Sequence, residues 1–273
     1  MKRILTALIL IPVVILLVFL APEWLVTVTA GLVALLAAWE FIGIARVTGA
    51  HTPRIASLVA IAILFAVSVL WPDKLSIMFG ALCLALLVYC TFASPVEHVL
   101  RDSTTSVFCL VYTGSTMLAL PMLRSSEDGR SLVLFLLCVV WAGDIAALYI
   151  GRNLGKHKLA PKLSPNKTWE GTAGSVAGSL LVTFGLFELA IALIKRDILV
   201  LSYPGQLSHW LFLAVLVNIA AQVGDLAESA LKRSAGVKDS GTLLPGHGGV
   251  LDRVDALLLA APVLWYAQVI QHF

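Results

Sequence analysis

The sequence has little charge and no closely spaced pair of cysteines. Only 13% of its 273 residues are Asp, Glu, Lys or Arg, against about 25% in soluble globular proteins. So little charge excludes an ordinary soluble domain, and the composition also excludes a disordered chain and a coiled coil. The four cysteines lie in apolar runs, so we interpret them as small buried hydrophobic residues and expect neither a disulfide nor a metal there. They are Cys83, Cys90, Cys109 and Cys138.

Hydrophobic residues make up 59% of the chain and gather in long runs. A membrane-crossing helix needs about 20 mainly apolar residues, so we predict an all-α, polytopic integral membrane protein with about nine transmembrane helices. The runs are approximately 4–21, 25–45, 55–71, 75–92, 105–123, 131–150, 172–194, 207–231 and 250–270. Only Pro22, Glu23 and Trp24 separate the first two, which therefore form either a tight hairpin or a pair that does not fully cross.

The distribution of basic residues predicts which side of the membrane each connection faces. If nine segments cross from a cytoplasmic N-terminus, 14 of the 19 Lys and Arg residues lie on the inside. This bias follows the positive-inside tendency and favours an N-in, C-out topology. The five that would lie outside are Lys74, Arg124, Arg130, Lys195 and Arg196.

The connection 151–171 is strongly basic. It holds five Lys or Arg residues and His157 before its first acid, Glu170. A bare basic cluster would serve equally well as a topology signal facing anionic lipid headgroups. Its glycines, prolines and hydroxyl groups favour a phosphate site, because they supply turns and hydrogen-bond donors among the cations. The residues we expect to bind substrate there are Ser164, Asn166, Lys167 and Thr168.

Carboxylates occur where hydrophobicity indicates membrane. Asp225 lies in the 207–231 run, Asp252 and Asp255 open the last helix, and Asp144 lies midway along the 131–150 run. Acids inside a membrane are costly to bury and commonly mark functional sites. The alternative is structural pairing with neighbouring cations. Glu40, near the inner end of the second run, is expected to reach water, so we interpret it as structural.

A cationic, glycine-rich stretch joins the last two runs. Lys232, Arg233 and Lys238 precede a turn at 245–249, which leads into a helix and would point backbone N–H groups at an anion. Carboxylates, cations and a glycine turn together describe a metal-phosphate site. Oxygen ligands without cysteine or paired histidine favour Mg²⁺. His247 in the turn is either a phosphate contact or a hydrogen-bonded turn residue.

These residues closely resemble the phosphatidate cytidylyltransferase (CDP-diacylglycerol synthase) family of bacterial membrane enzymes. The family signature S-x-hydrophobic-K-R-x4-K-D-x-G-x2-L-P-x-H-G-G-hydrophobic-x-D-R-hydrophobic-D is matched without a gap from Ser229 to Asp255. An upstream motif, roughly W-x2-D-[ST]-x-A-Y and then GKxKLxPxxSPxKTxEG, is matched between Trp141 and Gly171. It departs at Ile145, where a hydroxyl is usual, and at Leu148, where Tyr is usual.

The resemblance implies a reaction of CTP with phosphatidic acid that yields CDP-diacylglycerol and pyrophosphate. It implies that Asp225 and Asp252 bind the divalent ion, with Asp255 and Asp144 close by and room for a second cation such as K⁺. It also implies an all-helical homodimer in the bacterial inner membrane, with a site open to the cytoplasm and to lipid. No nucleic-acid partner is expected.

These interpretations assign roles along the chain. We expect residues 1–100 to form N-terminal transmembrane helices and 101–130 a central helix with a candidate dimer contact. Residues 131–273 would form the catalytic region, with cytoplasmic loops 151–171 and 232–250. The expected catalytic residues are Asp144, Asp225, Lys232, Arg233, Lys238 and Asp252. The expected substrate-binding residues are Ser164, Asn166, Lys167, Thr168, His247, Gly248, Gly249 and Arg253, and the metal ligands are Asp225, Asp252 and Asp255.

Two alternatives stay open. A CTP-dependent transferase could use another lipid phosphate, such as that of a polyprenol or an archaeal ether lipid. An anion transporter could line its pathway with the same acids and bases, but its charges would be distributed toward both faces rather than one. The D-G-x2-A-R pattern of CDP-alcohol phosphotransferases is absent from the sequence.

Overall fold

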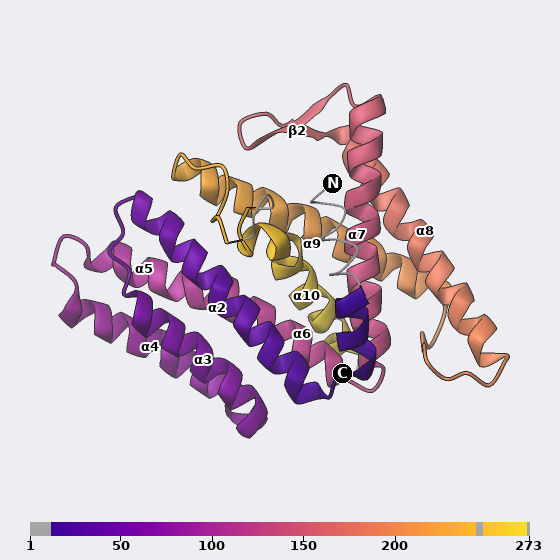
Figure 1. The fold of residues 1–273 in the computed structure, drawn as a ribbon, viewed down its shortest axis with the longest axis horizontal. Helices are drawn as coiled ribbons and strands as arrows, with labels where there is room; N and C mark the ends of the chain where they lie inside the picture. The colour runs from indigo at the N-terminus through magenta and orange to yellow at the C-terminus, as the bar shows by residue number, and fades with distance from the viewer. Residues whose placement is uncertain (1–11, 244–247, 272–273) are drawn as a thin grey trace. The chain divides into compact units, whose positions relative to one another are not determined.

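The computed structural model describes residues 12–243 and 248–271, and these residues are mainly helical with very little strand (Figure 1). After a helical segment at 12–20, the α-helices are α2 (Glu23–Val47), α3 (Arg54–Leu70), α4 (Leu75–Ala93), α5 (Val99–Cys109), α6 (Thr116–Arg124), α7 (Gly129–Leu154), α8 (Trp169–Ile194), α9 (Leu207–Ser234) and α10 (Leu251–Gln271). A 3₁₀ turn, η1 (Pro72–Lys74), precedes α4, and a π-helical stretch, η2 (Leu110–Ser115), joins α5 to α6.

The helices confirm the prediction of an all-α, polytopic membrane protein. Within the described residues, seven helical segments are long and apolar enough to cross a bilayer. They are 23–47, 72–93, 99–124, 129–154, 169–194, 207–234 and 251–270. The helix α3 has only 17 residues, and residues 4–11 of the first predicted span lie outside the described residues, so the count of nine is not confirmed.

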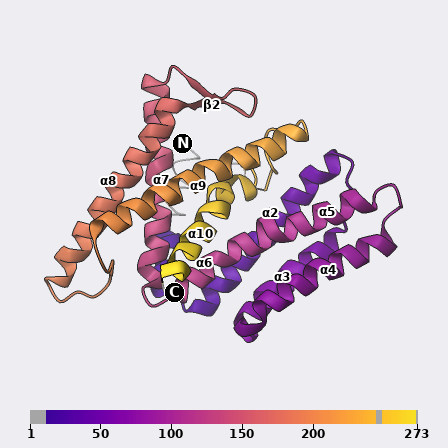
Figure 2. The ribbon, with the colours of Figure 1, turned by 180° about the vertical axis from the view of Figure 1, so that it is seen from behind.

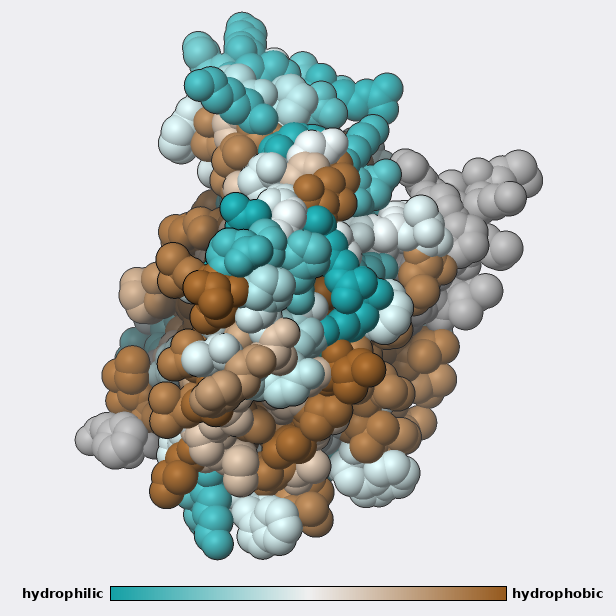
Figure 3. Space-filling view, turned by 90° about the vertical axis from the view of Figure 1, so that its left-hand side faces the viewer, coloured by the Kyte–Doolittle hydropathy of each residue, from teal (hydrophilic) through white to brown (hydrophobic). Residues whose placement is uncertain are grey.

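Large apolar side chains stay on the surface of the described helices. Phe92 is 86% exposed and Leu181 is 73% exposed. On the face drawn in Figure 3, broad hydrophobic areas lie between patches of hydrophilic residues. A water-soluble monomer rarely exposes such areas, whereas lipid chains would cover them.

The chain forms two compact units, and each is assembled from separate stretches of sequence. The first contains residues 21–121 together with 230–254, and the second contains 13–20, 122–229 and the last helix from Asp255. The C-terminal signature therefore packs with the N-terminal helices. In the first unit, α3 and α4 lie side by side in both views of the ribbon (Figures 1 and 2).

In the second unit, α7 and α8 pack closely along their length (Figures 1 and 2). A polar contact fixes their crossing with α9, because Asn218 Nδ2 donates to Ser175 Oγ and Ser179 Oγ, both at 2.8 Å. A side chain at Gly143 would place its Cβ 2.5 Å from that amide nitrogen. The missing side chain of Gly143 thus lets three helices meet next to Asp144.

The basic connection 151–171 contains a short hairpin that the sequence analysis did not predict. Strand β1 (Lys158–Ala160) pairs antiparallel with β2 (Ser164–Thr168). Thr168 also caps α8, since its hydroxyl accepts a hydrogen bond from Gly171 N at 3.1 Å. The Glu170 carboxylate accepts from the backbone of Lys156 and His157. These contacts fix both ends of the hairpin relative to the ends of α7 and α8.

Candidate functional site

Asp252, at the start of α10, is the most heavily bonded acid of the first unit. Its Oδ1 accepts from Lys232 Nζ at 2.5 Å, and the two side chains are only 9% and 12% exposed. Its Oδ2 accepts from Ser240 N, Ser240 Oγ and Gly249 N at 2.8–3.0 Å. The Asp252 carboxylate therefore has a fixed orientation beside the Lys232 ammonium group. Both residues were predicted from the sequence to be catalytic.

Glu40 reaches the same cluster from α2, and the expectation that it reaches water is wrong. Instead of reaching water, Glu40 is buried, with 6% of its surface exposed. Its carboxylate accepts from Val250 N at 3.0 Å, Leu251 N at 2.8 Å and Ser240 Oγ at 3.0 Å. The signal that could have identified it is its position, because an acid in an apolar run needs partners wherever it is buried.

The glycines of the signature make room for these two carboxylates. Gly248 has a φ of 79°, which favours glycine, and a Cβ there would lie 2.6 Å from Asp252 Oδ2. A Cβ on Gly249 would collide with the carboxylate of Glu40 and the hydroxyl of Ser240. The two predicted substrate-binding glycines are thus required to pack the acids. His247 lies outside the described residues.

The second unit holds a separate ionic cluster. Lys167 on β2 pairs with Asp225 on α9 at 2.6 Å, and their side chains are 25% and 36% exposed. Asp144 on α7 is exposed and lies within electrostatic reach of both groups. The structure therefore brings together three residues that the sequence analysis had assigned to the site from three separate segments.

The remaining predicted residues differ in exposure. Lys238 and Arg253 are exposed, and the exposed Arg233 donates to the carbonyl oxygen of Val237 at 3.0 Å. Asp255 is half-buried, and its Oδ1 accepts from the backbone N–H of the next residue, Ala256, at 2.8 Å. On the hairpin, Asn166 is exposed and Ser164 is half-buried. Among the described residues, no three His, Cys, Asp or Glu side chains gather closely enough to hold a metal by themselves.

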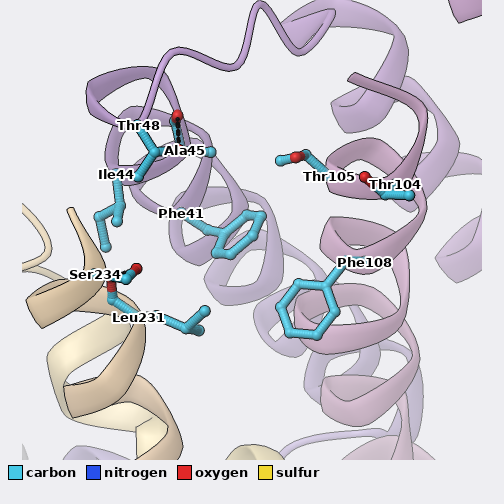
Figure 4. Close-up of a pocket in the computed structure, with 9 residues that line it drawn as sticks. All are labelled: Phe41, Ile44, Ala45, Thr48, Thr104, Thr105, Phe108, Leu231 and Ser234. Atoms are coloured by element: carbon cyan, nitrogen blue, oxygen red, sulfur yellow. Dashed lines mark hydrogen bonds between the residues drawn. The ribbon is translucent and has the colours of Figure 1, made fainter. Parts of the chain in front are cut away.

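A groove of about 370 Å³ opens in the first unit. In Figure 4 the rings of Phe41 and Phe108 lie next to each other, with centroids 5.5 Å apart, and Leu231 lines the groove from α9. The walls are mainly apolar, and the nine lining residues are Phe41, Ile44, Ala45, Thr48, Thr104, Thr105, Phe108, Leu231 and Ser234. Phe41 follows Glu40 and Leu231 precedes Lys232 in the sequence, so two lining residues are chain neighbours of members of the Asp252 cluster.

Comparisons with known proteins place these residues in context. A model of the cytidylyltransferase family matches residues 1–270. A phosphatidate cytidylyltransferase of Pseudomonas aeruginosa is 35% identical over 286 aligned residues, which cover 97% of each chain. Another from Staphylococcus saprophyticus is 37% identical over 67% of this chain and 65% of its own.

The Brucella relatives match over a shorter stretch. A phosphatidate cytidylyltransferase of Brucella melitensis is 49% identical over 157 residues, which are 57% of this chain and 54% of that protein. The aligned part therefore spans about half the length of these relatives.

Proposed function

The chain belongs to the cytidylyltransferase family, and we propose that it transfers the cytidylyl group of CTP to phosphatidic acid in a bacterial cytoplasmic membrane. The products are CDP-diacylglycerol and pyrophosphate. The observation that carries the proposal is the geometry of Asp252, whose carboxylate is held beside Lys232 by three further donors. We further propose that the site faces the cytoplasm, where CTP is available, and that the protein is a homodimer.

The proposed step joins two anions. An oxygen of the lipid phosphate forms a bond to the α-phosphorus of CTP while the bond to the β-bridging oxygen breaks and pyrophosphate leaves. The lipid phosphate needs no general base, because the second pKa of a phosphate monoester is about 6 and its oxygen is already ionised near neutral pH. The residues must therefore position the two phosphates and neutralise their charge.

The two lysines support this role. Lys232 and Lys167 each contact an aspartate at 2.5 and 2.6 Å. An ammonium group has three N–H donors, so each lysine can keep its aspartate and still contact a phosphate oxygen. The aspartate then fixes the direction in which the lysine presents its charge. Lys238 and Arg233, both exposed, are proposed as further phosphate contacts.

The donor chemistry fits a magnesium ion. Both clusters present carboxylate oxygens, and within the described part of the chain their contacts include no cysteine or histidine. Mg²⁺ is commonly held by one or two carboxylates together with substrate phosphates, which agrees with the absence of a larger acid cluster in the described residues. We propose Asp225 and Asp252 as ligands, with Asp255 nearby. When bound, the ion would neutralise charge on the reacting phosphates.

The groove supports a lipid substrate. Its apolar walls suit an acyl chain, and its rim is cationic because Arg101 Nη1 donates to the carbonyl oxygens of Thr48 and Gly49 at 3.2 Å. An occupant with an apolar chain and an anionic headgroup matches both features. We propose that one acyl chain of phosphatidic acid lies there while its phosphate reaches Lys232.

The test is direct transfer by the purified protein. The protein in detergent would receive CTP labelled at the α-phosphate, Mg²⁺ and phosphatidic acid. Label in the lipid with an equal amount of pyrophosphate would support the proposal. Transfer only to a polyprenol phosphate or an ether-lipid phosphate would favour the alternative acceptor. No transfer to any of the three, with flux of anions into proteoliposomes, would favour transport.

A further inference from the structure

We propose that Glu40 is a positioning residue for cytidylyl transfer. From α2 its carboxylate contacts the two segments that flank residues 244–247 in the sequence, at Ser240 on one side and at Val250 and Leu251 on the other. Through Ser240 it also fixes the orientation of Asp252. The kinetic part of this inference rests on the proposed function. Nothing in the C-terminal motifs assigns a role to α2, and the sequence separation between Glu40 and its partners is 200 residues or more. The inference therefore adds an N-terminal residue to the proposed site.

The first contact is with the start of α10. Val250 N and Leu251 N, which both donate to Glu40, precede or begin that helix and have no intrahelical acceptor. A carboxylate at a helix N-terminus satisfies these donors and is stabilised by the helix dipole. Glu40 thus acts as a cap supplied by another helix. It fixes where α10 begins, and Asp252 is the second residue of that helix.

The second contact links the two acids. Ser240 Oγ lies 3.0 Å from Glu40 Oε2 and 2.9 Å from Asp252 Oδ2. A hydroxyl carries a single proton, so the serine donates to one carboxylate at a time and its rotation depends on both. Ser240 N also donates to Asp252 at 3.0 Å. A shift of Glu40 would therefore move the residue that supplies two of the contacts to Asp252.

Glycines on both flanking segments leave room for the Glu40 carboxylate. A Cβ at Gly241 would lie 2.6 Å from Glu40 Oε1 and 2.8 Å from its Cδ. Gly249 faces the other oxygen in the same way. Two glycines on the two flanks thus pack directly against one buried acid. An acid that merely filled space in an apolar helix would need neither these glycines nor three donors from a distant segment.

The test is a double-mutant cycle between Glu40 and Gly241. Glu40→Asp withdraws the carboxylate by one methylene, so the added methyl of Gly241→Ala gains room. We expect Gly241→Ala to lower both kcat and the thermal midpoint in the wild-type background, and to cost at least about threefold less in kcat in the Glu40→Asp background. Such a difference is non-additivity between residues in contact. Gly80→Ala is the matched control, because nothing lies within 4 Å of its Cβ position.

Glu40→Gln provides the kinetic readout. The amide replaces one acceptor by a donor facing backbone N–H groups, so we expect kcat per folded molecule to fall about tenfold or more, while KM for phosphatidic acid stays within about twofold. Glu40→Asp should restore part of the lost rate. Glu97→Gln, an exposed acid of the same unit, should behave as wild type. A rate that falls only in proportion to the folded fraction would reduce Glu40 to a structural role and overturn the proposal.

The two measurements separate this inference from the proposed function. Coupled thermal midpoints in a protein that transfers no cytidylyl group to phosphatidic acid would overturn the proposed function alone. An active protein in which Gly241→Ala costs the same in both backgrounds would overturn the role of Glu40 alone.

Discussion

The two lysine–aspartate pairs allow a sharp comparison, because they have nearly equal lengths and different burial. Lys232 and Asp252 are 2.5 Å apart with side chains 12% and 9% exposed, whereas Lys167 and Asp225 are 2.6 Å apart and 25% and 36% exposed. The perturbation is the removal of each ammonium by Lys→Met, which keeps most of the side-chain volume. The environment of the aspartate left behind then decides the cost.

The expected magnitudes differ severalfold. Removing one partner of a buried ion pair typically costs about 3–5 kcal/mol, because the other charge stays buried. Asp252 keeps the backbone donors Ser240 N and Gly249 N, together with the Ser240 hydroxyl that it shares with Glu40, so we expect Lys232→Met to cost about 3 kcal/mol, the lower end of that range. Exposed pairs contribute about 0.2–1 kcal/mol, and we expect about 1 kcal/mol for Lys167→Met.

The assay is reversible unfolding in mixed micelles, with cycles that add Asp252→Asn and Asp225→Asn. The coupling energy should be larger for the Lys232–Asp252 pair by about 1–2 kcal/mol. An equal or larger coupling at Lys167–Asp225 would refute the reasoning, since it would mean that the exposed parts of that pair face lipid and not water.

Three further predictions concern activity. Asp225→Asn and Asp252→Asn should each abolish most cytidylyl transfer while membrane insertion, measured by fractionation and gel filtration, stays normal; wild-type rates in either variant would remove it from the metal site. Lys238→Ala should raise KM for CTP or phosphatidic acid, and an unchanged kinetic profile would return this exposed lysine to a topology signal. Thr105→Trp, which fills the groove, should raise KM for phosphatidic acid about tenfold, equivalent to about 1.4 kcal/mol, with KM for CTP unchanged; equal effects on both substrates would argue against an acyl chain there.

The helices could be predicted because long apolar runs have few other folds available in a membrane. The boundaries of α8 and α9 fall within about three residues of the predicted runs 172–194 and 207–231. The hairpin β1–β2 could not be predicted in this way, since Lys158–Ala160 and Ser164–Thr168 carry no apolar alternation. It depends on side-chain contacts at its ends, chiefly those of Glu170 with the backbone of His157.

The individual contacts of the site were less accessible to sequence reasoning than its members. The motif placed Lys232 and Asp252 in one functional segment, and the structure pairs them directly. It could not show that Lys167 lies against Asp225, because the two are 58 positions apart in the sequence and the packing of the hairpin brings them together. Thr168 was expected to bind substrate, and the structure gives its hydroxyl an acceptor role in capping α8.

The burial of Glu40 links an N-terminal helix to the candidate site. The signature stretch could have been a self-contained motif, with Asp252 oriented only by Lys232, Ser240 and Gly249, all within 20 residues of it in sequence. Such local contacts leave the start of α10 free to shift, because they all move with the same segment. Glu40 belongs to a different helix, so its contacts with both flanks hold the segment against the rest of the first unit. Among the acids of α2 only Glu40 is buried. Its contacts come from a helix outside the signature segment, so they can hold Asp252 in one orientation while two anionic substrates bind.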